Sequence, residues 1–204
     1  PVLLPDGTYQ SSPAHARPPV AFAFPEGDTA VTYTVVHVVR EGVVGDSHGD
    51  NDTVRFRQVF DNYYAYDDGT AENGYGLTST SSRVYLAYRF DLNVEDTLTA
   101  VDLYFNRTAE GENEQVPFRL MVWANDNGQP GTVLYSDQHN RHPEFDGLND
   151  FRRYVTENPV VVDGSIFVGF EQSNNHYINL GFDRSFNTAD RIYYLTGNRW
   201  QQSD

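Results

Sequence analysis

The chain has 204 residues and a formal net charge of −15. This length allows one large domain or two smaller ones with a substantial buried core. Cysteine is absent, which excludes disulfides, thiolate metal sites and cysteine nucleophiles. The acidic balance argues against nucleic acid as a partner, because phosphate binding needs clustered cations. We also expect no membrane insertion, since no apolar run is long enough to span a bilayer.

Residues 1–59 predict a small β segment with a linker. Prolines are frequent up to residue 25, which favours extended chain with one short strand at residues 20–24. Residues 31–40 are rich in β-branched side chains and residues 53–60 alternate apolar and polar, which predicts a hairpin with a long acidic loop. That loop contains a G-x-S-x-G match at residues 45–49. Because a strand follows it, and not the helix that a nucleophile elbow needs, we interpret it as a plain loop.

A second, larger β unit is expected over residues 60–204, and it opens with the sequence FDNYYAYDDGTAENGYGL at residues 60–77. Its aromatic start, residues 60–66, predicts a strand. Asp67, Asp68 and Gly69 predict an acidic turn, and Asn73-Gly74 predicts a second turn.

Apolar and polar residues then alternate along several short segments. Residues 84–92, 98–106 and 116–124 each place large apolar side chains on one face. Asp163-Gly164 predicts the turn of a hairpin between residues 160–162 and 166–171. Further strands are expected at residues 132–136, 177–182 and 191–195. About ten short strands without a helix predict an all-β fold, an antiparallel β-sandwich of jelly-roll type, with the small β segment at its N-terminus.

The acidic turn offers carboxylates for a hard cation. Asp67, Asp68 and Glu72 lie close together beside backbone carbonyls, the ligand set that calcium prefers, and they predict a structural calcium ion. The alternative is a turn in which these side chains accept hydrogen bonds from backbone amides. Both interpretations stay open at this stage.

Several motifs of the larger unit carry a family resemblance. YYAYDDGTAENGYGL at residues 63–77, PFRLMVWANDNGQPGTVLYS at 117–136 and INLGFDR at 178–184 resemble a jelly-roll β-sandwich module of large secreted surface proteins of the Bacteroidetes. In those proteins the module precedes a sorting domain for type IX secretion. VTYTVVHVVREG at residues 31–42 and GDNDTVRF at 49–56 are similar to the last strands of an immunoglobulin-like adhesion domain. The resemblance implies a secreted or cell-surface location and neighbouring domains in a larger chain, and it implies no catalytic role.

The expected function is therefore adhesion, or the binding of glycans or host and matrix proteins. Aromatic residues make up 14% of the chain, and aromatic faces can stack on sugar rings. The candidates for such binding are Tyr63, Tyr66, Tyr75, Trp123 and Trp200. One alternative is a structural spacer without a ligand. Another is a glycoside hydrolase, for which Glu171 is a candidate acid, although no partner carboxylate is evident from the sequence.

Overall fold

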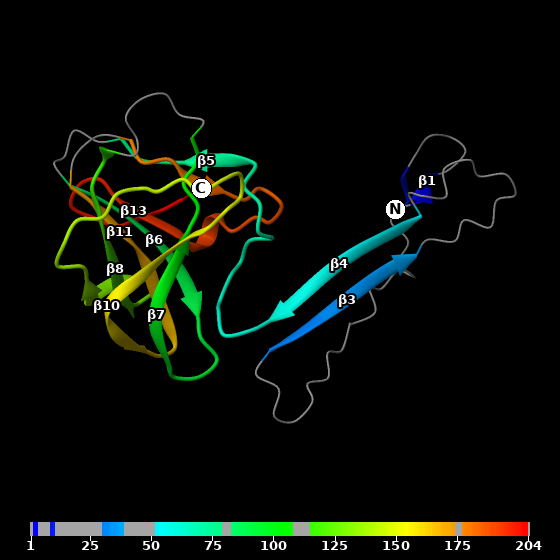
Figure 1. Ribbon diagram of the computed structural model, residues 1–204, viewed down its shortest axis with the longest axis horizontal. Coiled ribbons are helices and arrows are strands. Elements are labelled where there is room, and N and C mark those ends of the chain that lie inside the picture. Colours follow the sequence, from blue (N-terminus) through cyan, green and yellow to red (C-terminus); the bar gives the residue numbers. More distant parts are fainter. Residues whose placement is uncertain are drawn as a thin grey trace, which may run out of the picture. The chain divides into compact units, whose positions relative to one another are not determined.

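The computed structural model describes residues 2–3, 9–10, 30–38, 52–78, 83–107, 115–173 and 177–203. They belong to two compact units, Pro1–Tyr63 and Tyr64–Asp204. Both units are built from antiparallel strands (Figure 1). No helix in the part of the chain that is described is long and apolar enough to cross a membrane.

The first unit contains two antiparallel strand pairs. β3 (Val31–Val38) pairs with β4 (Thr53–Phe60) over its full length, from Val31 opposite Phe60 to Val38 opposite Thr53. The rings of Tyr33 and Phe60 meet edge to face, with centroids 6.0 Å apart. β1 (Val2–Leu3) pairs with β2 (Tyr9–Gln10). The predicted hairpin is confirmed, whereas the predicted strand at residues 20–24 and the G-x-S-x-G loop lie outside the described residues.

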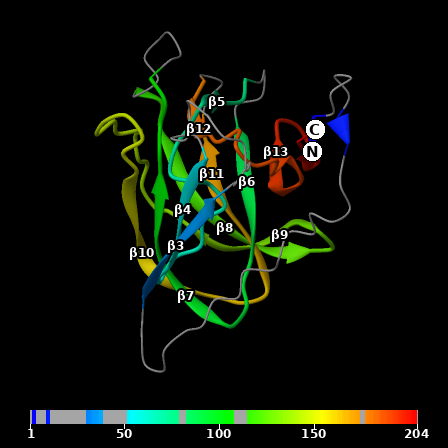
Figure 2. The same ribbon diagram turned by 90° about the vertical axis from the view of Figure 1, so that its right-hand side faces the viewer.

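The second unit is a β-sandwich, which confirms the predicted fold class. Its larger layer is a six-stranded sheet with the order β14-β13-β6-β11-β8-β9. A second layer, formed by β7 and β10, covers one face of that sheet, and β5 pairs with β12 at one end (Figures 1 and 2). The strands are β5 (Asn73–Tyr75), β6 (Val84–Asp91), β7 (Asp96–Leu103), β8 (Phe118–Asp126), β9 (Gln129–Ser136), β10 (Arg152–Val162), β11 (Ser165–Gln172), β12 (Leu180–Phe182), β13 (Ile192–Leu195) and β14 (Gln201–Gln202). A short 3₁₀ helix, η2 (Ala189–Arg191), precedes β13.

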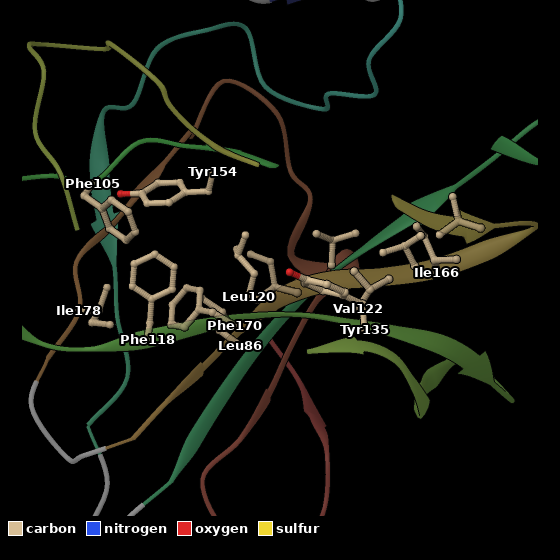
Figure 3. Close-up of a cluster of buried hydrophobic side chains, with 14 of the residues drawn as sticks. Leu86, Phe105, Phe118, Leu120, Val122, Tyr135, Tyr154, Ile166, Phe170 and Ile178 are labelled. Atoms are coloured by element: carbon tan, nitrogen blue, oxygen red, sulfur yellow. The ribbon is translucent and has the colours of Figure 1, made fainter. Parts of the chain in front are cut away.

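The main core lies between the two layers. Figure 3 shows it as a row of side chains, with Phe105 and Tyr154 at one end and Val122 and Ile166 at the other. Aromatic edge-to-face contacts link the layers, such as Phe118 on Tyr154 at 5.3 Å between ring centroids. The alternation read from the sequence is confirmed here, because Leu86 on β6 and Leu120 on β8 point into this core.

A smaller apolar cluster covers the other face of the six-stranded sheet. Its buried members are Ala87, Met121, Trp123, Phe167 and Tyr193. Tyr85 and Trp200 pack against them and are partly buried. The six-stranded sheet is therefore covered by apolar side chains on both faces at this point.

Three local predictions are wrong. β4 ends at Phe60, and residues 61–66 form no strand. Asn73-Gly74 forms no turn but begins β5, where Gly74 is needed because a Cβ there would lie 1.8 Å from Asn179 Oδ1. Asp163-Gly164 closes no hairpin, since β10 pairs with β7 while β11 pairs with β6 and β8. The Asp163-Gly164 turn instead carries the chain from one layer of the sandwich to the other.

Candidate functional site

The acidic turn at residues 67–70 is held by its own side chains. The amide of Gly69, which has a φ of 86°, donates to Asp67 Oδ1 at 3.0 Å. Thr70 donates to Asp68 Oδ1 twice, from its amide at 3.0 Å and from its hydroxyl at 2.6 Å. The predicted turn is confirmed, with the side chain to backbone hydrogen bonds that the alternative interpretation requires.

Two hydrogen bonds connect the turn and Glu72 to the loop that follows β12. The amide of Asp68 donates to Asp183 Oδ2 at 3.0 Å, and the amide of Arg184 donates to Glu72 Oε2 at 2.8 Å. These bonds bring one carboxylate oxygen each of Asp68, Glu72 and Asp183 within 4.8 Å of one another. Two of the three predicted calcium ligands are thus together, and Asp183 stands where Asp67 was expected. Calcium binding here stays a prediction, because exposed carboxylates often gather without an ion.

The carboxylates of the turn differ in their electrostatics. The hydrogen bonds from Thr70 hold the pKa of Asp68 below its usual value, and the Arg184 amide does the same for the pKa of Glu72. The pKa of Asp67 is instead raised, first by desolvation and then by the charges of Asp183 and Asp68. Although part of Asp67 is exposed to solvent, neighbouring atoms surround its carboxyl group closely enough to disfavour its charged form.

A cavity of about 190 Å³ is lined in part by residues of the acidic turn, Asp67 and Thr70. Its walls come from segments far apart in the sequence: the residue 66–75 stretch, β6, β7, β11 and β12. Most of the wall is aromatic or aliphatic, and its polar groups include carboxylates and threonines. The aromatic members are Tyr66, Tyr75, Tyr88, Phe90, Tyr104, Phe151, Phe170 and Phe182, and the acidic members are Asp67, Asp102 and Asp183.

Tyr66 is held in this wall by four groups. Its ring packs on Phe90 at 5.5 Å and on Tyr88 at 6.0 Å between centroids. The Arg191 guanidinium lies 4.0 Å from the ring centroid, and its Nη1 donates to Asp91 Oδ2 at 2.8 Å. The Tyr66 hydroxyl accepts a hydrogen bond from the Asp91 amide at 3.4 Å. The wall is therefore built around an oriented ring.

The five aromatic residues predicted to bind ligand lie in three different places. Tyr66 and Tyr75 line the cavity. Trp123 is only 3% exposed, and Trp200 packs on it at 5.4 Å on the outer face of the six-stranded sheet. Tyr63, which is 54% exposed, belongs to the first unit. The structure thus brings Tyr66 and Tyr75 together at one cavity and places Trp123 within packed apolar structure.

Glu171 lies away from the cavity. It alternates with Phe170 on β11 and shares the outer face of the sheet with Phe167. Its carboxylate is nearly buried and pairs with Arg83 Nε at 3.5 Å. The residue suggested as a hydrolase acid is thus placed as the partner of an arginine at the surface.

Sequence reasoning missed Tyr88, Phe90, Phe182 and Asp183 as members of the site. Tyr88 and Phe90 were predicted to face the core, which is correct, but no local pattern shows that the core opens beside them. Asp183 follows β12 directly, and a carboxylate at the end of an apolar strand is the one signal that could have found it. Its proximity to Asp68, 115 residues earlier, is a product of the fold.

Comparison with known proteins gives no further assignment: no family model, no curated protein and no solved structure matches this chain.

Proposed function

We propose that this chain is a non-catalytic binding module of a secreted or cell-surface protein, and that the cavity beneath Tyr66 is its binding site. The observation that carries the proposal is a cavity whose wall combines an oriented aromatic ring, further apolar side chains and carboxylates. Concave, mostly apolar sites with a few polar groups at defined positions are typical of ligand binding.

The size of the cavity supports a binding role. Protein interiors are close-packed, and voids larger than a water molecule are few. An apolar cavity of about 150 Å³ is enough to bind benzene. The cavity beneath Tyr66, at about 190 Å³, is therefore large enough for a six-membered ring with a short substituent.

The nature of the wall favours a protein partner over a bare sugar. A sugar ring enclosed by aromatic and aliphatic side chains would leave several hydroxyl groups without hydrogen-bond partners, at a cost of a few kcal/mol each. A side chain of a matrix or host protein can instead bury an apolar body there and leave its polar end at the opening. Adhesion to a protein is thus the form of binding that the cavity supports best.

A matched pair of variants tests this proposal. Val101 lines the cavity, and Val101→Phe adds a ring to it, whereas Val133→Phe makes the same change on β9 outside it. We expect benzyl alcohol to bind the unmodified chain and the Val133→Phe variant in an NMR titration, and to bind the Val101→Phe variant at least several-fold more weakly. Equal binding by both variants, or no binding by the unmodified chain, would contradict the proposal and favour the spacer.

A further inference from the structure

We infer that the group bound in this cavity carries a positive charge: an aromatic or alkyl ammonium whose apolar body lies among the rings and whose cation lies at Asp67 and Asp183. This inference rests on the proposed function and assigns a ligand class to the same site.

The charged residues that line the cavity are all acidic. Asp67, Asp102 and Asp183 line it, and the residues that form its wall include no arginine or histidine. Asp183 already accepts hydrogen bonds from the amides of Asp68 and Ser185, which fixes its carboxylate in place. Asp102 is already paired with Arg153, so an anionic ligand would be repelled chiefly by the carboxylates of Asp67 and Asp183.

The carboxylate of Asp67 has room for a cationic partner. Its Oδ1 accepts the amide of Gly69, a neutral donor, and the nearby charges that act on it are those of Asp183 and Asp68. The pKa of Asp67 is raised first by desolvation and then by these two charges. A ligand cation beside it offsets both the desolvation and the repulsion.

The aromatic walls favour the same ligand class. The faces of Tyr and Phe rings are electronegative, and they attract a cation within about 6 Å of the ring centroid. The protein already uses this interaction at the cavity wall, where the Arg191 guanidinium lies 4.0 Å from the Tyr66 ring centroid. At longer range, the net charge of −15 raises the encounter rate of a cationic partner.

Three probes with the same ring test the inference: benzylamine, benzyl alcohol and benzoate, titrated separately at pH 7 and followed by NMR. We expect benzylamine to bind more tightly than benzyl alcohol by about three- to tenfold, the advantage of a partly exposed ion pair with a cation–π contact. Benzoate is expected to bind most weakly. Asp67→Asn keeps a carbonyl oxygen that accepts the Gly69 amide, and Asp183→Asn keeps one of the two acceptors used by the amides of Asp68 and Ser185. Each variant should reduce the advantage of benzylamine over benzyl alcohol.

The outcomes separate the inference from the proposed function. Benzyl alcohol that binds the cavity as tightly as benzylamine overturns the inference and leaves the binding module intact. An advantage of benzylamine that persists in the double variant Asp67→Asn/Asp183→Asn also overturns it, because the charge is then recognised elsewhere. If none of the three probes binds, both proposals fail.

Discussion

All 14 basic residues of this chain, not counting histidine, are arginine, and Asp137 shows how one of them pairs with a buried carboxylate. Its side chain has no exposed surface. One carboxylate oxygen accepts the Leu120 amide at 2.8 Å and Arg141 Nε at 2.6 Å, and the other accepts Arg141 Nη2 at 2.8 Å and the Tyr135 hydroxyl at 2.5 Å. The planar guanidinium makes both contacts at once, which an ammonium group cannot do.

We expect Asp137→Asn to lower the free energy of unfolding by about 2–3 kcal/mol, because it removes the charge that Arg141 pairs with in a desolvated position. Urea unfolding measures the change. Asp102→Asn is the matched control, since Asp102 forms a similar two-bond pair with Arg153 at 2.8 Å, but at the surface. The control should change stability far less, and an equal loss in both variants would contradict the importance of burial.

The same residue predicts a dependence of stability on pH. Burial alone would raise the pKa of Asp137, but the hydrogen bonds from Arg141, Tyr135 and Leu120 outweigh it and hold the pKa below 3.8. The folded state therefore binds this proton more weakly than the unfolded state does. The stabilisation is present above about pH 4 and is lost as the pH falls through the folded-state pKa. We expect the stability difference between the unmodified chain and Asp137→Asn to shrink below pH 3.8, and a constant difference would contradict this explanation.

At the scale of elements, the pairing of β5 with β12 depends on a close approach at Gly74. A Cβ at this position would lie 1.8 Å from the buried Asn179 side chain, which donates to the Asn106 carbonyl at 2.9 Å. Gly74→Ala should therefore cost about 1–3 kcal/mol, the range for an overpacked interior. Gly197→Ala, where a Cβ would meet nothing within 4 Å, is the control and should be neutral. Thermal unfolding of both variants measures the change in stability, and an unchanged stability of Gly74→Ala would contradict the close approach of Gly74 to Asn179 in the pairing of β5 with β12.

The acidic turn gives a prediction about calcium. If the carboxylates of Asp68, Glu72 and Asp183 hold the ion, calcium should raise the melting temperature and a chelator should reverse the effect, because the ion binds only the folded state. Asp183→Asn should abolish the response and Asp67→Asn should keep it. A melting temperature that is unchanged by calcium, in protein shown by metal analysis to be ion-free, contradicts the site. If Asp67→Asn abolished the response and Asp183→Asn kept it, the ligands would be those predicted from the sequence, Asp67, Asp68 and Glu72.

The elements also show what the sequence can predict. Alternation of apolar and polar residues identified β6 and β8 and assigned the face of each strand that enters the main core, because successive side chains of a strand point to opposite faces. The pairing of β10 was mispredicted, since Asp163-Gly164 has the chemistry of a hairpin turn and local rules do not distinguish a turn within a layer from one between layers. The turn predicted at Asn73-Gly74 was wrong for a similar reason, because glycine is also required in a strand where a neighbouring side chain approaches the backbone closely.

For the whole molecule, the sandwich class followed from the number and spacing of amphipathic strands, but the cavity did not. Its wall joins Tyr66, Tyr88, Tyr104 and Phe182, and the first and last of these lie more than a hundred residues apart in the chain. An aromatic side chain that fills a core and one that borders a cavity have the same local pattern. Ligand binding by these aromatic residues stays a prediction, and only the fold shows that Tyr66 and Tyr75 line the same cavity.

The measurement that tests the central claim most directly is the position of a bound ring, obtained from intermolecular NOEs between benzyl alcohol and the assigned aromatic protons of the 204-residue chain. We expect contacts to Tyr66, Tyr88 and Phe182, which line the cavity. Contacts confined to Tyr85 and Trp200 would place binding on the outer face of the six-stranded sheet and contradict the assignment of the cavity as the binding site.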